Sequence, residues 1–451
     1  MDVASIIKDV VPESKGRNVR VLSQNGANVG PGSGGLYRDA NFLSRNFQRA
    51  SPKLYITAEE EDFDELAVQE WRDEGFDVEY FSLESYPAED GAYIRKLRDL
   101  SLQEYGPCEK FGIIAFGDAA ALCLEHYHVL DNNPMFKMGL LVAYYPTSIP
   151  DPKGKFPSSI EVLVHLTTGE EINVTRRTQM VGIQGKRRTT REKVEAGIGV
   201  GGSLQLAYPT YTYDAAEPGF AEHDMEEYNR VAAELAWSRS LAAARRAFGN
   251  HVEAEMLLET NTHSKFISPD HSESVNAYTT HKTPHVTNIP TLTGGTGAEE
   301  LKTFYTEYFQ HPPSLRVTLI SRTIGSDRVV DELYVRFKHT RSAPWILPGV
   351  PPTNKRVELL MVSIVALRGG KLFHEHVYWD QASVLVQIGL LDPKLVPEGS
   401  GMKRLPVVGR EAARRMAKGA DTDVGEADNE LIRSSESDVE GGEEEHLTTQ
   451  K

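Results

Sequence analysis

The sequence predicts two consecutive folded regions of different class, a doubly wound α/β sheet followed by an α+β region. Continuous apolar strands alternate with amphipathic helices in the first half of the chain, which is typical of a parallel sheet covered on both faces. Two antiparallel hairpins with glycine-bearing turns follow between residues 315 and 380. A chain of 451 residues is also too long for one ordinary core, so more than one domain is expected.

The composition is that of a soluble globular protein, with 40% hydrophobic and 25% charged residues. The formal net charge of −16 argues against nucleic acid or an anionic membrane as a partner. No apolar run approaches the roughly 20 residues of a membrane span, and residues 1–20 lack the apolar core of a signal peptide. The two cysteines, Cys108 and Cys123, provide no disulfide framework. We expect a cytoplasmic protein that binds neither nucleic acid nor membrane.

The first region alternates strands and helices in a regular order. The predicted strands are Pro52–Thr57, Phe76–Leu83, Phe111–Phe116, Met138–Tyr145, Ile160–Leu166 and Leu204–Tyr208. The predicted helices are Phe63–Glu74, Tyr93–Glu104, Ala121–His128 and Met225–Phe248. This alternation predicts one parallel sheet with helices on both faces.

A sharp turn at Ala115–Ala120 leads from one of these strands into the next helix. Two further segments match the same order, Val162–Leu166 with Gly169-Glu170-Glu171 after it, and Tyr213–Phe220 before the last helix. Residues 15–249 therefore resemble an α/β-hydrolase, most closely the dienelactone hydrolase family. The resemblance implies a nucleophile, a histidine base and a carboxylate at three places in the region.

Two of those three places lack the side chain that the chemistry requires. Gly117 stands where the family has its nucleophile, and Pro218 stands where the family has its catalytic histidine. Glu171 is the nearest candidate for the carboxylate. Glycine provides no nucleophile, and proline has no side-chain nitrogen that can accept a proton. The resemblance with this degenerate triad predicts a pseudo-hydrolase.

A rearranged active site is the alternative interpretation of the first region. Asp118 follows the expected nucleophile position directly, and His223 lies a few residues beyond the expected base position. If these two side chains came within hydrogen-bond reach, they could hydrolyse an ester or a lactone, as a carboxymethylenebutenolidase does.

The second region contains four predicted strands in two hairpins. These strands are Arg316–Ile324, Arg328–His339, Arg356–Arg368 and Lys371–Asp380, joined in pairs by Gly325-Ser326-Asp327 and Gly369-Gly370. Glycine permits the positive φ that tight hairpin turns require.

Polar side chains share one face of the last predicted strand. By the two-residue period, that face carries His374, His376, Tyr378 and Asp380, and the other carries Phe373, Glu375, Val377 and Trp379. Asp331 lies among apolar residues on one face of an earlier strand. Imidazoles, a phenol and carboxylates among hydrophobic residues suggest the lining of a pocket.

The segment Gly370–Asp380 and the helix-like Gln381–Leu391 resemble the final strand and tail of SnoaL-like proteins, in the nuclear-transport-factor-2-like superfamily. His285–Pro290 and Gly294–Leu301 resemble the segment before that family's pocket-covering helix. The resemblance covers about residues 251–395. It implies a cone of curved sheet and helices, cofactor-independent acid/base chemistry on a small apolar molecule, and a homodimer through the sheet.

The same resemblance places the catalytic carboxylate at Asp380. His376, on the same strand face, would orient the substrate or share the proton. A carboxyl among apolar side chains has its pKa raised toward neutrality, which suits proton transfer. The expected pocket-lining residues are His285, Asp331, Tyr378 and His374.

Histidine clustering raises the question of a metal. His374 and His376 are two residues apart on a strand and could bind a metal together, but a third ligand would have to come from elsewhere. No HExxH or comparable ligand pair occurs. We expect neither a metal nor another cofactor.

Four segments are expected: an N-terminal extension (1–14), the α/β domain (15–249), the SnoaL-like domain (250–395) and a disordered acidic tail (396–451). The leading functional hypothesis is cyclisation or isomerisation, or binding, of a small apolar carbonyl compound in the cone. One alternative is an ester or lactone hydrolase with a rearranged site. The other is a non-catalytic ligand-binding or scaffold protein.

Overall fold

A computed structural model describes residues 51–86, 91–106, 109–177, 187–198, 201–214, 216–249, 254–266, 272–280 and 282–418. All of them belong to one compact unit, Ser51–Lys451. The expected N-terminal extension, Cys108 and the acidic residues beyond 418 lie outside the described residues. The domain boundaries expected after residues 249 and 395 stay predictions.

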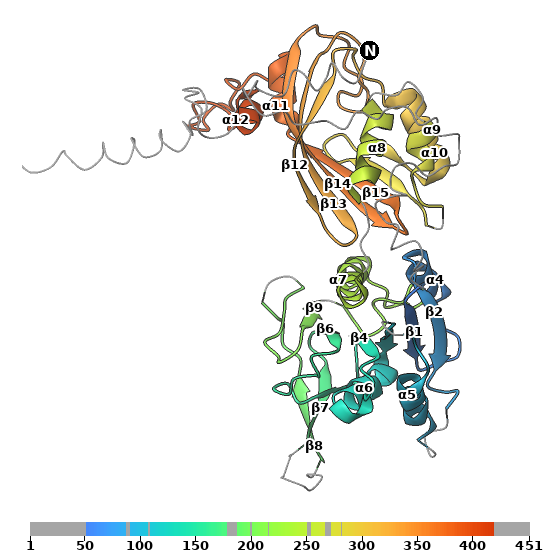
Figure 1. Cartoon of the computed structure of the whole chain (residues 1–451). Helices are drawn as coiled ribbons and strands as arrows, with labels where there is room; N and C mark the ends of the chain where they lie inside the picture. Colours follow the sequence, from blue (N-terminus) through green and yellow to red (C-terminus); the bar gives the residue numbers. More distant parts are fainter. Residues whose placement is uncertain are drawn as a thin grey trace, which may run out of the picture. The chain divides into compact units, whose positions relative to one another are not determined.

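The first sheet has six strands in the order β2-β1-β3-β4-β6-β9, and all neighbouring strands are parallel (Figure 1). The strands are β1 (Lys53–Ala58), β2 (Asp77–Ser82), β3 (Phe111–Phe116), β4 (Met138–Tyr144), β6 (Glu161–Thr167) and β9 (Thr210–Tyr213). The parallel sheet predicted from continuous apolar strands is therefore confirmed. Its last strand was expected at Leu204–Tyr208, which is wrong by several residues.

Helices cover both faces of the first sheet. The helices are α4 (Glu65–Asp73), α5 (Ala92–Leu102), α6 (Gly117–Tyr127) and α7 (Arg230–Phe248). Leu97 of α5 and Leu124 of α6 belong to one apolar core, and Trp71 of α4 and Trp237 of α7 belong to another. Strands β3 and β4 lie between these cores with every residue buried, which explains their unbroken apolar sequence.

Capping side chains set where two of these helices begin. The carboxylate of Asp64 accepts hydrogen bonds from the backbone N–H groups of Leu66 and Ala67 at the start of α4. Asn229 caps α7 in the same way, so this helix begins at Arg230 and not at Met225 as predicted.

A small three-stranded sheet, which the sequence did not predict, lies beside the first. Its order is β5-β7-β8, with β5 at Ser148–Pro150, β7 at Glu171–Arg177 and β8 at Arg187–Lys193.

The second sheet has the order β11-β10-β15-β14-β13-β12. The strands are β10 (His285–Asn288), β11 (Thr293–Thr296), β12 (Arg316–Ile324), β13 (Arg328–Lys338), β14 (Arg356–Arg368) and β15 (Lys371–Trp379). The two hairpins predicted between residues 315 and 380 are confirmed as antiparallel pairs. Strand β10 pairs with β15 in parallel.

Helices α8 (Ala254–Phe266), α9 (Ser272–Asn276) and α10 (Gly297–Thr303) precede or interrupt the strands of this sheet. Leu258 of α8 and Leu301 of α10 share one core with Val329, Leu333 and Val335 of β13. We call the sheet face that meets this core the inner face. The turn Phe304–Tyr308 continues directly from α10.

Two short helices follow the second sheet, α11 (Gln381–Ile388) and α12 (Glu411–Lys418). Helix α12 falls within the segment expected as a disordered tail. It is held at the sheet, because the guanidinium of Arg414 donates two hydrogen bonds of 2.9 Å to Glu358 of β14. Across the described ranges, every helix is too short or too polar to cross a membrane.

Candidate functional site

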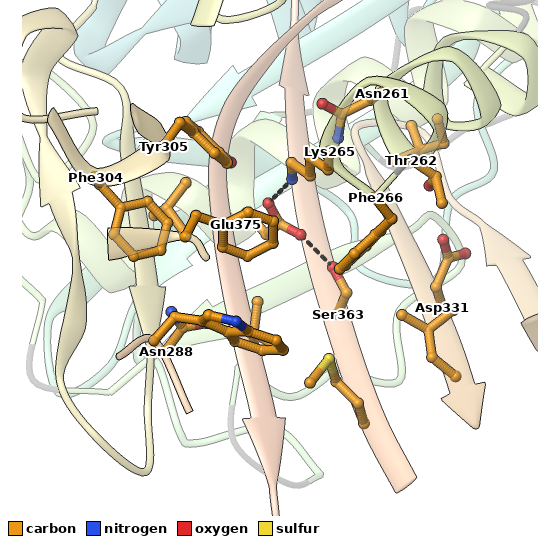
Figure 2. Close-up of a pocket in the computed structure, with 17 residues that line it drawn as sticks. Asn261, Thr262, Lys265, Phe266, Asn288, Phe304, Tyr305, Asp331, Ser363 and Glu375 are labelled. Atoms are coloured by element: carbon orange, nitrogen blue, oxygen red, sulfur yellow. Dashed lines mark hydrogen bonds and ion pairs between the residues drawn. The ribbon is translucent and has the colours of Figure 1, made fainter. Parts of the chain in front are cut away.

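A small cavity lies between the inner face of the second sheet and helix α8, with a free volume of about 30 Å³ (Figure 2). Most of its wall is apolar or aromatic, including Leu333, Phe304, Met361 and Trp345. The polar lining residues are Asn261, Thr262, Lys265, Asn288, Tyr305, Asp331, Ser363 and Glu375. We call this space the cone cavity.

A buried ion pair stands at the wall of the cone cavity. The ammonium group of Lys265, on α8, donates a hydrogen bond to the carboxylate of Glu375, on β15. Lys265 is 4% exposed and Glu375 is 8% exposed. Two hydroxyl groups also donate to Glu375, from Ser363 at 2.8 Å and from Tyr278 at 3.3 Å.

The ion pair is charged at neutral pH. Burial opposes the ionisation of Glu375, but the charge of Lys265 and the hydrogen bonds to the carboxylate outweigh burial, so the pKa of Glu375 is lowered. Burial would lower the pKa of Lys265, yet the charge of Glu375 raises it above its usual value. The cavity wall therefore presents a fixed ammonium beside a fixed carboxylate.

A second compensated carboxylate lines the same cavity. Asp331 of β13 accepts two hydrogen bonds from the guanidinium of Arg322, at 2.7 and 2.8 Å. Arg322 also donates to Glu255 at 2.8 Å, and these hydrogen bonds raise the pKa of its guanidinium. Both carboxylates in the cone cavity thus have a cation as partner.

Of the residues expected to form the site, Asp331 lines the cone cavity. The others do not: Asp380, His376, His285, Tyr378 and His374 are absent from its wall. The reason is the two-residue period of β15, because Glu375 and Val377 point into the cavity and the alternate residues point to the opposite face. The expected polar face and the observed lining face are opposite faces of one strand.

Asp380 has a capping role. Its side chain begins helix α11 by accepting a hydrogen bond from the backbone N–H of Ser383 at 3.2 Å. The residue itself is exposed to solvent, as is Tyr378, which is 40% exposed. The three histidines, His285, His374 and His376, lie together on the outer face of the sheet.

Sequence reasoning missed the buried ion pair of Lys265 and Glu375. One signal pointed to Glu375, because it alternates with the apolar residues Val377 and Trp379. A carboxylate at such a position requires a buried partner. The partner could not be deduced, since Lys265 lies 110 residues earlier in the chain.

The three degenerate triad positions of the first region do meet in space. Gly117, Glu171 and Pro218 all line one cleft next to the first sheet, with a free volume of about 750 Å³. Among the described residues, seven carboxylates line this cleft against one cation, Arg191; they are Glu59, Glu60, Asp62, Glu170, Glu171, Glu222 and Asp224. We call it the acidic cleft.

Gly117 begins helix α6 directly after strand β3, with a φ of +51°. A glycine suits this backbone, since other residues rarely adopt a positive φ. The carboxylate of Glu59 lies where a side chain at position 117 would begin, and it accepts a hydrogen bond from the backbone N–H of Asp118. The carboxylate of Glu59 thus lies next to the first backbone N–H groups of α6, where the helix dipole favours a negative charge.

The rearranged pair Asp118 and His223 is not formed. The carboxylate of Asp118 accepts a hydrogen bond from the hydroxyl of Thr147. The Nδ1 atom of His223 lies 2.7 Å from a carboxylate oxygen of Asp64, the residue that caps α4. Each member of the expected pair has a different partner, so the geometry does not support hydrolysis by these two residues.

Burial raises the pKa of two carboxyl groups in the acidic cleft. It raises the pKa of Glu222 to about 7, and the nearby carboxylates of Asp224 and Glu59 add to this effect. The hydroxyl of Tyr145 donates a hydrogen bond to Glu222, which acts in the opposite direction. Burial also raises the pKa of Glu59.

No protein-family model matches this sequence. No curated protein matches it either. Many solved structures are similar to about a third of the chain. A proposed SnoaL-like polyketide cyclase from Jannaschia sp. CCS1 is 18% identical over 31% of this chain and 92% of that chain, with a TM-score of 0.26. A hypothetical protein with a ketosteroid isomerase-like fold from Catenulispora acidiphila is 15% identical over 31% and 97%, with a TM-score of 0.25.

AclR, a proposed hydroxylase from Streptomyces galilaeus, is 20% identical over 35% of this chain and 91% of that chain, with a TM-score of 0.24. With TM-scores below 0.5, these similarities alone assign neither a fold nor a function to the chain.

Proposed function

We propose that the second sheet and its helices form a SnoaL-like cone that binds a small apolar carbonyl compound. The cone would move a proton at the carbon next to the carbonyl group, as isomerisation and cyclisation both require, without a cofactor. The observation that supports this proposal is the ion pair of Lys265 and Glu375, buried at the wall of an otherwise largely apolar cavity.

Lys265 would polarise the carbonyl group. Its pKa is raised, so the ammonium keeps its proton and its charge across the neutral range. A buried cation aimed at a carbonyl oxygen stabilises the negative charge that develops there when an adjacent proton leaves. Glu375 holds Lys265 in place and keeps it protonated.

Glu375 would accept the proton. An ionised carboxylate offers about four lone-pair sites. The hydrogen bonds from Lys265, Tyr278 and Ser363 occupy three of them. One site then remains for a proton from the substrate, and the lowered pKa keeps the carboxylate ionised when the substrate enters.

The size of the cavity limits the substrate. A free volume of about 30 Å³ holds roughly two water molecules, since one needs about 10–15 Å³. A molecule of a few non-hydrogen atoms therefore fits with small movements of the lining side chains. A polycyclic substrate would require the cavity to open.

The test is exchange of the methyl protons of acetone for deuterium in D₂O, followed by NMR. We expect the protein to accelerate this exchange, and Glu375→Gln to remove the acceleration. Asp380→Asn is the matched control, because it preserves a capping oxygen outside the cavity. Circular dichroism verifies that each variant is folded. Acceleration that survives in folded Glu375→Gln, or is lost in Asp380→Asn, rejects the proposal.

A second candidate function is ligand binding without catalysis in the acidic cleft. The volume of about 750 Å³ favours it, because this space is of the size that drug-sized ligands occupy. Carboxylates together with Phe63 and Tyr145 suit an amine that carries an apolar group. Calorimetric titration with benzylamine tests it, since binding should weaken at least about tenfold in Glu59→Gln if this carboxylate contacts the amine. The homodimer and the cytoplasmic location stay predictions.

A further inference from the structure

Three histidines form a cluster on the outer face of the second sheet. His285 of β10 is the register partner of His374 on the parallel strand β15, and His376 lies two residues further along β15. The ring centroids are 4.7 to 5.2 Å apart, and the Nε2 atoms of His285 and His376 are separated by 3.0 Å. One ring nitrogen from each residue lies within 4.8 Å of the other two.

The backbone fixes this arrangement. Residues on one face of paired strands keep constant positions relative to one another, because the hydrogen bonds of the sheet set their register. His374 is 3% exposed, and the other two histidines are partly buried. The three imidazoles are therefore held together by strand pairing, as the ligands of a preformed site must be.

A hydrogen bond between two rings does not account for the whole cluster. Such a bond explains the close approach of His285 and His376. It does not account for the Nδ1 atom of His374, which is buried and has no hydrogen-bond partner within the described part of the chain. A buried polar atom without a partner costs free energy, and coordination to a metal would remove this cost.

The spacing fits a tetrahedral ion after small movements. Bonds of 2.0–2.1 Å to imidazole nitrogen place two nitrogens of a tetrahedron about 3.3 Å apart. The observed separations of 3.0 Å and at most 4.8 Å bracket this value.

We propose that His285, His374 and His376 bind one divalent transition metal ion, for which Zn²⁺ fits best, with one coordination position left open. Three imidazoles and one open position are the ligand set of catalytic zinc sites. The third ligand, which sequence reasoning could not supply, comes from the neighbouring strand β10. The positive charges of Arg230, Arg328 and Arg368 act on the three histidines, so the affinity should be lower than that of a closed structural zinc site.

Zinc and cobalt titrations test this inference directly. The full chain, expressed without a histidine tag and treated with a chelator, is titrated with ZnCl₂ in a calorimeter and with CoCl₂ in a spectrophotometer. We expect one strongly bound ion per chain and the visible absorption bands of tetrahedral Co²⁺. His285→Gln and His376→Gln should each weaken binding at least about tenfold, and the double variant should lose the cobalt bands.

His263→Gln is the matched control, since His263 is an exposed histidine on helix α8 outside the cluster. It should bind zinc as the unchanged protein does. Absence of zinc binding by the folded, unchanged protein overturns the inference. So does zinc binding that persists in the double variant, because the ion would then lie elsewhere. Loss of acetone exchange in Glu375→Gln bears on the proposed function and leaves this result unaffected.

Discussion

The acidic cleft and the cone cavity differ in how they accommodate buried carboxylates. In the cone cavity, Glu375 and Asp331 each face a cation, Lys265 and Arg322. In the acidic cleft, Glu222 is accommodated by a proton, since burial raises its pKa to about 7. A nearby cation favours the charged form of a carboxylate, whereas a pKa raised to about 7 lets Glu222 change its charge near neutral pH.

The two sites also differ in their free volume. The acidic cleft has a free volume of about 750 Å³ but a glycine at the expected nucleophile position. The cone cavity has about 30 Å³ and a fixed pair of opposite charges. The larger space and the buried ion pair of opposite charges are thus found in different parts of the protein, and this contrast can be tested one residue at a time.

The largest expected effect is that of Lys265→Met. This change leaves Glu375 buried without its cation, so the free energy of unfolding should fall by about 3–5 kcal/mol. Adding Glu375→Gln should restore part of the loss, because the second change removes the uncompensated charge. Urea unfolding of the two single variants and the double variant measures this coupling. Strictly additive losses would contradict the account.

The next effect concerns pH and Glu222. Its pKa in the folded protein is raised from 4.5 to about 7, so folding favours the protonated form. The resulting stabilisation is fully present below pH 4.5 and is lost as the pH rises through 7. The thermal stability of Glu222→Gln, relative to that of the unchanged protein, should therefore be higher at pH 8 than at pH 5. Thermal unfolding at the two pH values measures this, and equal differences at both would show that the carboxyl titrates normally.

A smaller effect is expected for Gly117→Ala, which places a side chain at a φ of +51°. The strain should cost about 1–2 kcal/mol. Combining it with Glu59→Ala removes the carboxylate that crowds this position, and the remaining loss then measures the backbone strain.

Gly117→Ser should not hydrolyse p-nitrophenyl acetate faster than the unchanged protein. A gain of esterase activity would show that a base is within reach after all.

The smallest effect is that of Asp380. Replacement by alanine removes the cap of α11 and should cost about 1 kcal/mol, whereas asparagine should be nearly neutral because it also caps helices. Chemical unfolding compares the two variants. A large loss in the asparagine variant would mean that the charge of Asp380 matters beyond capping.

Local patterns predicted most of the strands of both sheets. Unbroken apolar runs marked β3 and β4, and glycine turns marked the hairpins β12–β13 and β14–β15. The hairpin β7–β8 could not be predicted in this way. Strand β8 contains only charged residues and threonines, all exposed or partly exposed, and β7 mixes the buried Ile172 and Val174 with polar residues. Local sequence therefore did not predict these two strands, because the polarity of their side chains gives no sign that they pair.

The cavity-lining face of β15 was not predictable either. Both of its faces mix polar and apolar residues, with His374 and His376 on one and Glu375 and Val377 on the other. What decides between them is a distant residue, since Lys265 compensates the charge of Glu375 and allows it to be buried. Pairings over such separations leave no signal in the period of a single strand.

A crystal structure of the protein soaked with acetone tests the central claim most directly. The account predicts acetone in the cone cavity, with its oxygen within about 2.7–3.2 Å of the Lys265 ammonium nitrogen and a methyl carbon facing Glu375. Acetone bound beside Asp380, or found in the acidic cleft while the cone cavity excludes it, would contradict the account.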